Sequence, residues 1–297
     1  LAGEGGMKHV GSIVAGALRA YETRQENRKK GIFTGVPSGF VELDELTNGW
    51  QGGQFIVIGA RPAMGKTALQ MLKTAAKHGV PACMYSLEMS DVSLANRLLL
   101  SECDISVERF RGGELSEDEV LKMHRAAGVI EKLPVYIDDK PSVTINYIRN
   151  HARLMHKRGK CGLIVVDYLQ LTGSQVDNIR NREQEVSNIS RTAKIIAKEL
   201  NVPFIMLSQL NREAEKRPDK KPMLADLRES GSIEQDADCV LFLYRDSYYA
   251  SQNPDGAEVD ADTAECIVAK NRHGETSTVP LGWDGAHTRF MDVDFKR

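Results

Sequence analysis

The sequence predicts an α/β protein with a mostly parallel central sheet flanked by helices and a C-terminal β extension. Two observations lead to this fold class. From residue 31 onward, short apolar runs alternate with amphipathic helical patterns, which is typical of parallel strands joined by crossover helices. The tail from Glu265 to Phe290 has short β-like runs at 271–274 and 283–285 with turn residues between them. Those runs predict a hairpin or meander at the edge of the sheet.

Six short apolar runs are the strand candidates. They cover residues 54–58, 82–85, 135–137, 163–166, 204–207 and 239–244. Residues 183–200 predict an amphipathic helix, because apolar residues recur on one face at helical spacing. Two polar stretches without periodicity, 172–182 and 212–224, each follow the C-terminal end of a strand. Ligand-facing loops of open α/β sheets emerge at that edge.

The chain is expected to have three parts. Residues 1–7 are small and glycine-rich and predict a flexible tail, residues 8–30 predict an amphipathic helix, and residues 31–297 suffice for one large α/β domain. The apolar stripe of the helix has to be buried somewhere. The residues alone leave open whether it covers its own domain or a neighbouring subunit. The stripe consists of Val10, Ile13, Val14, Ala17, Leu18 and Tyr21.

Composition is that of a soluble globular protein, with 41% hydrophobic and 27% charged residues. The formal net charge of −2 provides no general attraction to nucleic acid, so any DNA contact must come from a local lining of positive groups. The five cysteines are scattered and form no C-x-x-C pair, which favours reduced thiols in a cytoplasmic protein over a disulfide or zinc framework. The longest apolar runs have the length of strands, so we expect no membrane span.

The segment from Ala60 to Thr67 predicts a phosphate-binding loop, because it follows a predicted strand and opens a predicted helix. Backbone N–H groups of such a loop and of the helix N-terminus attract phosphate oxygens. Lys66 adds a positive charge at the β and γ phosphates, and the Thr67 hydroxyl can bind Mg²⁺. Ala60 stands where the strict G-x-x-x-x-G-K-S/T pattern has glycine, and Gly59 is expected to supply the flexibility. The predicted nucleotide-binding residues are Ala60, Arg61, Pro62, Ala63, Met64, Gly65, Lys66, Thr67 and Ala68.

Two predicted strands end in acids that suit ATP hydrolysis. Asp167 ends a run of four apolar residues and is expected to hold Mg²⁺ through water, while Thr67 holds the ion directly. Glu88 closes the first strand after the phosphate-loop helix. If that strand lies beside the phosphate-loop strand, Glu88 points toward the γ phosphate and is the candidate base for the attacking water. The pair Asp138 and Asp139 also ends a strand and is the rival base.

Gln209 follows the strand at 204–207, on the same edge of the sheet as Asp167. A glutamine there can hydrogen-bond a γ phosphate and move when that phosphate leaves. A simple polar residue at a strand end fits the spacing equally well. Taken with the phosphate loop, these strand ends predict a chain that binds and hydrolyses ATP with Mg²⁺.

Together these segments resemble the DnaB family of bacterial and phage replicative DNA helicases. The resemblance extends over nearly the whole chain, roughly from Lys8 to Phe290. Its most specific segment is DLRESGSIEQDAD at 226–238. The other matching segments are TGVPSGF at 34–40, ARPAMGKT at 60–67, SLEMS at 86–90, VDYLQL at 166–171 and LSQLNR at 207–212.

The resemblance implies a RecA-like P-loop NTPase core, a homohexameric ring, and 5′ to 3′ translocation on single-stranded DNA that unwinds duplex at a replication fork. It makes Glu88 the catalytic glutamate and Gln209 the phosphate sensor. Lys270 and Arg272 match the element that reaches the neighbour's nucleotide, with Arg272 as arginine finger. Solvated hairpin charges are the alternative interpretation of these two cations.

The same resemblance assigns the contact with DNA. Arg228, Glu229 and Gly231 fall on the loop that contacts the DNA backbone in the channel of the ring. Six copies of the basic residues near this loop could form a positive stripe, so binding is expected to be phosphate-directed and sensitive to salt. The helix at 8–30 resembles the family's linker helix, which docks on the adjacent subunit. The basic residues are Arg212, Lys216, Arg217, Lys220, Lys221 and Arg228.

The family's N-terminal helical domain, which forms a collar and binds primase, has no counterpart in this sequence. We therefore expect a fragment or a shortened relative, with primase and a helicase loader as partners of the full-length protein. Two other function classes compete with the helicase. A RecA-like recombinase or DNA-repair ATPase would pair strands without processive unwinding. An idle subunit or loader-type adaptor would bind nucleotide without turnover, against which Glu88, Gln209 and Arg272 argue together.

Overall fold

A computed structural model describes residues 7, 9–31, 34–61, 67–167, 179–211, 214, 217, 220–227, 230–250 and 262–293, without the side chains of 28, 179–182, 230, 249 and 250. Its helices are α1 (Val10–Lys29), α2 (Val41–Thr47), α3 (Thr67–Lys77), α4 (Asp91–Cys103), α5 (Val107–Gly112), α6 (Glu117–Ile130), α7 (Ile145–Lys157), α8 (Ile179–Leu200), the short 3₁₀ helix η2 (Leu224–Asp226), α9 (Ser230–Asp236) and α10 (Asp246–Ala250). Its strands are β1 (Phe55–Ala60), β2 (Ala82–Ser86), β3 (Val135–Asp138), β4 (Leu163–Asp167), β5 (Phe204–Gln209), β6 (Cys239–Tyr244), β7 (Thr263–Asn271), β8 (Ser277–Asp284) and β9 (Arg289–Asp292).

The strands form one sheet in the order β3-β2-β4-β5-β1-β6-β7-β8-β9. The part from β3 to β6 is parallel, and β7, β8 and β9 are added antiparallel. The predicted fold class and all six predicted strands are confirmed. β1 begins one residue later than expected and continues to Ala60, so the first residue of the predicted phosphate loop still belongs to the strand.

Glu88 is expected to point toward the γ phosphate on the condition that β2 lies beside β1, and the structure does not meet that condition. β2 is the first strand after α3, yet it does not lie beside β1. β1 pairs with β5 on one side and β6 on the other, and both β4 and β5 separate it from β2. A parallel connection can skip strands because its helix carries the chain across the face of the sheet. Glu88 therefore follows a strand that borders the Asp167 strand, not the phosphate-loop strand.

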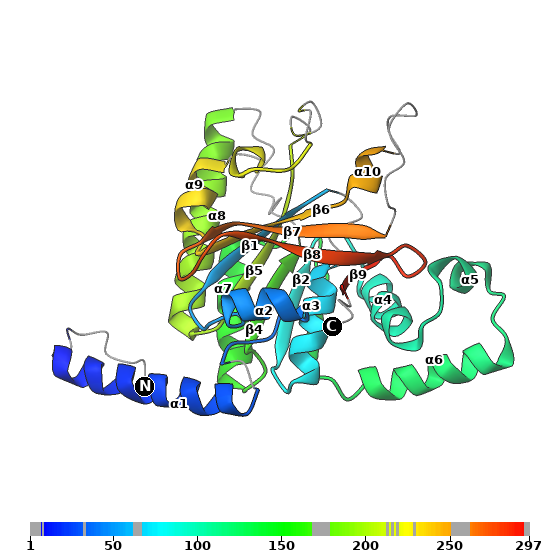
Figure 1. Cartoon of the computed structure of the whole chain (residues 1–297), viewed down its shortest axis with the longest axis horizontal. Helices are drawn as coiled ribbons and strands as arrows, with labels where there is room; N and C mark the ends of the chain where they lie inside the picture. Colours follow the sequence, from blue (N-terminus) through cyan, green and yellow to red (C-terminus); the bar gives the residue numbers. More distant parts are fainter. Residues whose placement is uncertain are drawn as a thin grey trace.

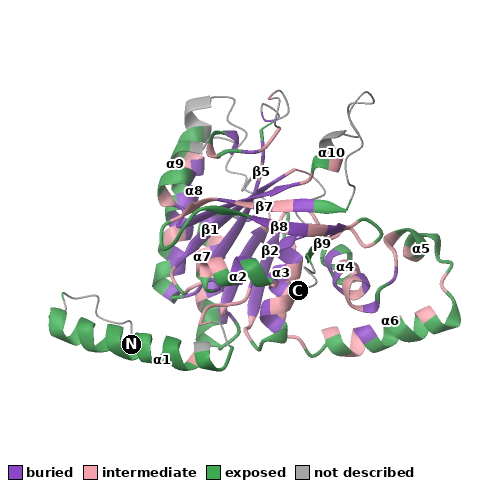
Figure 2. Cartoon of the chain, viewed as in Figure 1, coloured by how far each residue is buried: buried purple, intermediate pink, exposed green. Residues whose placement is uncertain are grey.

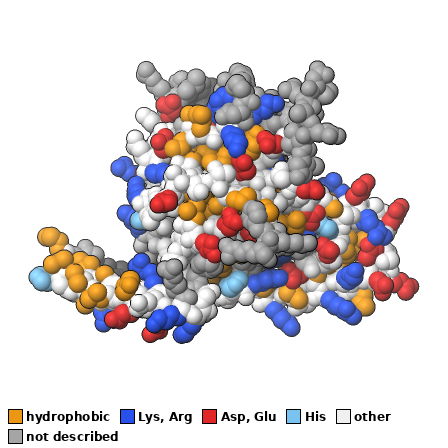
Figure 3. Space-filling model, viewed as in Figure 1, with side chains coloured by type: hydrophobic (Ala, Val, Ile, Leu, Met, Phe, Trp, Pro, Cys, Tyr) orange, Lys and Arg blue, Asp and Glu red, His pale blue; other side chains and the backbone are white. Residues whose placement is uncertain are grey.

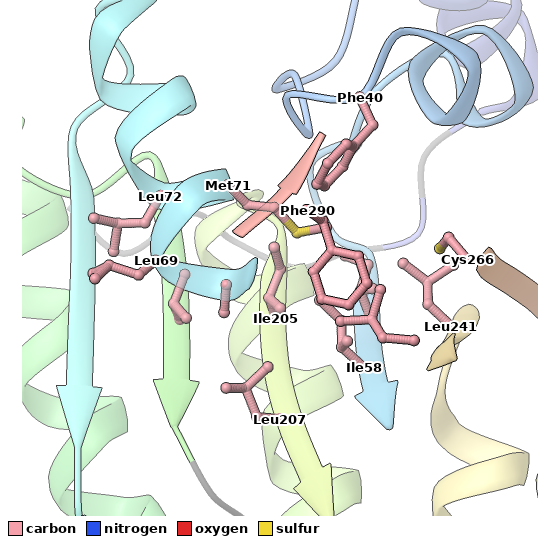
Figure 4. Close-up of a cluster of buried hydrophobic side chains, with 14 of the residues drawn as sticks. Phe40, Ile58, Leu69, Met71, Leu72, Ile205, Leu207, Leu241, Cys266 and Phe290 are labelled. Atoms are coloured by element: carbon pink, nitrogen blue, oxygen red, sulfur yellow. The ribbon is translucent and has the colours of Figure 1, made fainter. Parts of the chain in front are cut away.

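Helices cover both faces of the parallel strands, because alternate side chains of each strand point to opposite faces. On one face, Ile56 and Ile58 of β1 join a core with α2, α3, α4 and the C-terminal strands. On the other face, Phe55 and Val57 join a second core with α7, α8 and α9 (Figure 1). Figure 4 shows Ile58 and Phe290 together in the first core. The two cores hold the parallel strands between two layers of helices.

The C-terminal meander confirms the predicted sheet extension and corrects its details. The predicted β-like run at 271–274 is mostly a turn, since β7 ends at Asn271, whereas the run at 283–285 begins within β8, which ends at Asp284. Buried and exposed residues alternate along the strands that flank these turns. β7 is antiparallel to β6, with Asn271 opposite Cys239. The end of β7 is thereby brought back to the amino end of β6.

The helix predicted at 8–30 is confirmed as α1, and its apolar stripe is not buried on its own domain. Figure 2 shows α1 as an exposed helix that projects from the side of the sheet, and Figure 3 shows hydrophobic side chains along it. At least half of the surface is exposed in Val10, Ile13, Val14, Leu18 and Tyr21. In the described part of the chain, no helix is both long and apolar enough to cross a membrane. Docking of α1 on another copy therefore stays a prediction.

Candidate active site

The carboxyl ends of four parallel strands bring most of the predicted catalytic residues to one edge of the sheet. Gln209 at the end of β5 is paired in register with Ala60 at the end of β1. Asp167 at the end of β4 is paired with Ser86 at the end of β2. Because β4 and β5 are neighbours, these two pairs lie side by side. The edge thus joins the start of the phosphate loop to the predicted metal ligand.

The phosphate loop is flanked by the strand and the helix that phosphate binding requires. β1 leads into the loop and α3 begins at Thr67, whose side chain is buried, as is the adjacent Ala68. Arg61 does not point freely outward, since its Nη1 donates to the carbonyl oxygen of Leu210 at 3.0 Å. The remaining predicted loop residues, Pro62, Ala63, Met64, Gly65 and Lys66, lie outside the described residues.

Gly59 has a packing role in place of the flexibility expected of it. It lies within β1, paired with Ser208 on one side and Phe242 on the other. A side chain at this position would place its Cβ 2.7 Å from the Phe242 ring and 3.1 Å from Leu210. The absence of a side chain allows β6 to pack closely against the strand that enters the loop.

A serine-fixed turn places Glu88 between β2 and α4. The Ser86 hydroxyl donates to the carbonyl oxygen of Met89 at 2.9 Å and accepts from its N–H at 3.2 Å. Ser90 then caps α4, because its hydroxyl accepts from the N–H of Ser93 at 3.3 Å. Glu88 is exposed at the apex of this turn, two residues beyond the partner of Asp167 in the sheet.

Asp167, Glu88 and Arg97 form a charge cluster at this edge. Burial raises the pKa of Asp167 to about 6, and the nearby Glu88 carboxylate adds to the increase, while Arg97 opposes it. The pKa of the Arg97 guanidinium is lowered by its own burial, against the effect of the two acids. Two carboxylates that repel each other in a partly buried site favour the arrival of a cation. Sequence reasoning missed Arg97, which reaches the cluster from the second turn of α4.

The rival acids have structural partners instead. Asp138 accepts a hydrogen bond from the Tyr147 hydroxyl at 2.7 Å, and Asp139 accepts one from the N–H of Asp91 at 3.0 Å. Their strand, β3, is the outermost of the parallel strands and the farthest from β1 among them. This arrangement favours Glu88 over Asp138 and Asp139 as the base.

The donor set at this edge suits magnesium held with a nucleotide. Among the residues that the structure describes, no group of three or more His, Cys, Asp or Glu side chains could hold a metal ion alone. Mg²⁺ is commonly bound by one or two carboxylates together with substrate phosphates and water. Asp167, whose raised pKa reflects an uncompensated charge, and the Thr67 hydroxyl fit that incomplete protein shell.

Lys270 and Arg272 lie at the opposite, amino edge of the parallel strands. The Arg272 N–H donates to the carbonyl oxygen of Asp238 at 2.8 Å, and Asp238 directly precedes β6. The Nη1 atom of Arg272 lies 3.2 Å from the Asp238 carboxylate. The pKa of Lys270 is lowered by burial and by the nearby Arg272. Because a six-residue strand such as β1 is roughly 17–20 Å long, Arg272 cannot reach the phosphate loop of its own chain.

The predicted DNA contacts are only partly described. Arg228 and Glu229 lie outside the described residues, and Gly231 lies exposed in the first turn of α9 and not in a loop. Two of the basic residues nearby are paired with acids. Arg217 Nη1 donates to Asp226 at 2.8 Å, and Lys221 Nζ lies 2.6 Å from Glu265. Less of the local positive charge is therefore available to DNA than the sequence suggests.

Comparison with known proteins identifies the family to which this chain belongs. The model of the DnaB-like helicase C-terminal domain matches residues 35–292, which include both edges of the sheet. This chain belongs to the DnaB-like helicase family. It is 46% identical to the replicative DNA helicase DnaB of Leifsonia xyli subsp. xyli over 92% of its length, and 42% identical to that of Geobacillus stearothermophilus over 90%. It spans 59% of each of these relatives.

Two solved structures share the fold. One, described as an ATPase domain, is 37% identical, with a TM-score of 0.85 that covers 96% of this chain and 99% of that one. The other, a DnaB-like replicative helicase described with its interactions with primase, has a TM-score of 0.81 at 37% identity and covers 93% of this chain and 66% of that one. The RecA-like P-loop core predicted from the sequence is thus confirmed.

Proposed function

We propose that this chain is the ATP-hydrolysing motor of a replicative DNA helicase, which moves 5′ to 3′ on single-stranded DNA as a homohexameric ring and unwinds duplex at the fork. One observation carries the proposal. The nucleotide-facing groups lie at the carboxyl edge of the sheet, and the cations Lys270 and Arg272 lie at the amino edge, beyond reach of that site. A complete hydrolytic site then requires a second copy of the chain. Family membership supports this arrangement.

Within one copy, the groups at the carboxyl edge bind ATP and activate the attacking water. Thr67 and Asp167 would hold the Mg²⁺ that accompanies ATP, and the ion would supply positive charge to the phosphates. Glu88 accepts the proton of the attacking water, for which its exposed position beside Asp167 is suited. Lys66 binds the β and γ phosphates. Gln209, in register with Ala60, hydrogen-bonds the γ phosphate and responds to its loss.

Between copies, the amino edge supplies positive charge. Arg272, and Lys270 with it, approach the triphosphate bound by the adjacent copy and stabilise the charge of the transition state. The exposed stripe of α1 docks on that adjacent copy, which would bury the apolar side chains that its own domain leaves in solvent. Residues 8–30 are then the linker helix of the ring and residues 31–297 its motor domain, while the predicted flexible tail at 1–7 lies, except for Met7, outside the described residues.

The remaining assignments concern DNA and partners. Arg228, Glu229 and Gly231 contact the DNA backbone in the channel. Primase and a helicase loader are partners of the full-length protein. The five cysteines are free and buried, which supports a reducing, cytoplasmic compartment.

Unwinding of a forked duplex tests the proposal. The wild-type chain should unwind a fork with a 5′ single-stranded arm when ATP and Mg²⁺ are present, and Lys66→Ala should not. Light scattering in Mg²⁺ and nucleotide should give the mass of a hexamer. Strand pairing without unwinding would instead support a RecA-like recombinase, and nucleotide binding without turnover would support an idle subunit. Binding to single-stranded DNA should weaken steeply with salt.

A further inference from the structure

Asp238 is a buried acid at the amino edge that serves two cations from different elements. Its side chain is 1% exposed and lies between Lys194 of α8 and Arg272 at the end of β7. The same carboxylate accepts the N–H of Phe55, the first residue of β1, at 2.8 Å. Lys194 also donates to the carbonyl oxygen of Gly53 at 2.8 Å. A buried carboxylate with this many partners fixes the position of whatever it holds.

The C-terminal end of α9 also binds Lys270 and Arg272. Arg272 Nη2 donates to the carbonyl oxygen of Gln235 at 3.3 Å, and Lys270 Nζ donates to that of Glu234. These are carbonyl groups of the last turn of α9, where the helix dipole favours positive charge. Arg272 is held through Nη1, Nη2 and its backbone N–H, yet its side chain remains 47% exposed. A guanidinium has five N–H donors, so exposed donors are left for a phosphate oxygen.

We propose that Asp238 is a positioning residue that acts across the subunit boundary: it holds Arg272 in the orientation needed by the nucleotide bound to the adjacent copy. The inference rests on the proposed function of Arg272 and adds the group that orients it. A long, flexible side chain loses rotamer freedom when it meets a transition state, and an anchored one has already lost it.

The position of α9 adds a route by which DNA could affect the same cations. α9 begins at Ser230, directly after Arg228 and Glu229 in the chain, and ends at the carbonyl groups that hold Lys270 and Arg272. A displacement of α9 along its axis would move both cations. The described contacts thus join the predicted DNA segment to the trans-acting charges through one short helix.

A purely structural role is the competing explanation for Asp238, because its contact with Phe55 also orders β1 of the same chain. Mixing two inactive variants separates the explanations. In an equal mixture of Asp238→Asn with Lys66→Ala, each site takes its phosphate loop from one copy and its Arg272 from the adjacent copy. About a quarter of the sites then combine an intact phosphate loop with a neighbour whose Asp238 is intact. DNA-stimulated ATP turnover should recover to about that fraction of wild type if Asp238 acts on the adjacent site. Absence of recovery would overturn the inference.

Alone, Asp238→Asn should lower turnover at least about tenfold, a part of the roughly 10³-fold loss expected when an arginine finger is removed. On an Arg272→Ala background the same substitution should have little further effect, because both act through one group. Full additivity would contradict a role through Arg272. Asp284→Asn is the matched control: Asp284 is paired with His287 and Arg289 and has no contact with Lys270 or Arg272 among the described interactions, so turnover should stay close to wild type.

Two further arms keep the test decisive. If Asp238→Asn melts early because Lys194 loses its carboxylate, the double variant Asp238→Asn with Lys194→Met removes the unpaired buried cation and is mixed in its place. The mixture of Arg272→Ala with Lys66→Ala tests the proposed function itself. If that mixture also fails to recover, the trans site is wrong and both proposals fall. If it recovers while the Asp238 mixture does not, only the role of Asp238 is wrong.

Discussion

The two edges of the parallel sheet differ in how far their charged groups are paired within the chain. At the carboxyl edge, Asp167 and Glu88 repel each other and burial raises the pKa of Asp167 to about 6. At the amino edge, Arg272 and Lys270 are held by a buried carboxylate and by the end of α9. At the carboxyl edge the two acids thus still repel each other despite Arg97, whereas the amino edge presents cations that are already oriented.

This difference shows how a site can be divided between copies of one chain. Parallel strands separate the two edges by their own length, and no side chain spans that distance. An antiparallel strand, β7, is what returns Arg272 to the amino edge. Under the proposed function, each chain presents a receptor for phosphate and metal on one side and a donor of positive charge on the other. Such a head-to-tail interface closes into a ring when its rotation allows.

Removal of the donor is the largest perturbation. Arg272→Ala should lower DNA-stimulated ATP turnover about 10³-fold, because the transition-state charge is no longer neutralised across the interface. Nucleotide affinity should change far less, since the receptor edge is intact. Steady-state turnover and equilibrium binding of a fluorescent nucleotide measure the two effects. Arg289→Ala, which removes an arginine of β9 paired with Asp284 and remote from the amino edge, is the control. Unchanged turnover in Arg272→Ala would contradict the proposal that the amino edge of one copy completes the site of the next.

Glu88 tests the receptor edge in isolation. Glu88→Gln should lower turnover by about 10²-fold or more, because the attacking water loses its base. Nucleotide binding should persist, since the amide is uncharged and no longer repels phosphate. Asp138→Asn should have a small effect, because Asp138 binds Tyr147 on the outer strand. The two variants are compared by single-turnover hydrolysis, and a larger defect in Asp138→Asn would exchange their roles.

Asp167 links the receptor edge to pH and stability. Its pKa of about 6 exceeds the value of about 3.9 in an unfolded chain, so the folded form binds the additional proton between these values. The contribution of Asp167 to the free energy of unfolding should therefore fall as pH rises from about 4 to about 6 and then level off. Asp167→Asn should stabilise the nucleotide-free chain at pH 7.5 by about 1 kcal/mol while abolishing Mg²⁺-dependent turnover. Thermal melting at pH 5 and 7.5 measures the first effect, and a destabilised variant would contradict it.

The same carboxylate must lose its proton to bind a metal ion. Mg²⁺ affinity in the presence of nucleotide should therefore weaken as pH falls through about 6. Magnesium titrations of ATP turnover at pH 5.5 and 7.5 check this expectation, with the Asp139→Asn variant as control because that acid binds the N–H of Asp91 instead. Equal magnesium requirements at both pH values would argue against Asp167 as a ligand.

The smallest effect on the folded monomer is expected from α1. Replacing Ile13 and Leu18 by serine should change the free energy of unfolding by less than about 0.5 kcal/mol, because both side chains are exposed on the chain's own domain. The oligomer should nevertheless dissociate if the stripe docks on another copy. Light scattering measures the mass, and the same exchange to serine at Arg19 and Arg24, two exposed polar positions of the same helix, serves as control. An unchanged mass would place the contact between copies elsewhere.

Much of the fold follows from local pattern. The six strands and the helices α3 and α8 were predictable because apolar runs and their spacing reflect burial on one face or on two. The phosphate loop and the strand-end acids were predictable because chemistry demands particular residues at one edge. Strand order was not, since a crossover helix can carry the chain past any number of strands, and whether β2 lies beside β1 was left as a condition that the structure does not meet.

The sequence by itself determined which residue types are available to the site. These are the phosphate loop with Lys66, the strand-end residues Asp167, Glu88 and Gln209, and the cations Lys270 and Arg272. Only the tertiary structure decided that Arg97 joins the two acids and that Asp238 holds Arg272. Those contacts join segments far apart in the chain, and no local periodicity encodes them. Charge and hydrogen-bonding partners depend on distance in space, which the order of strands in the sheet establishes after the chain has folded.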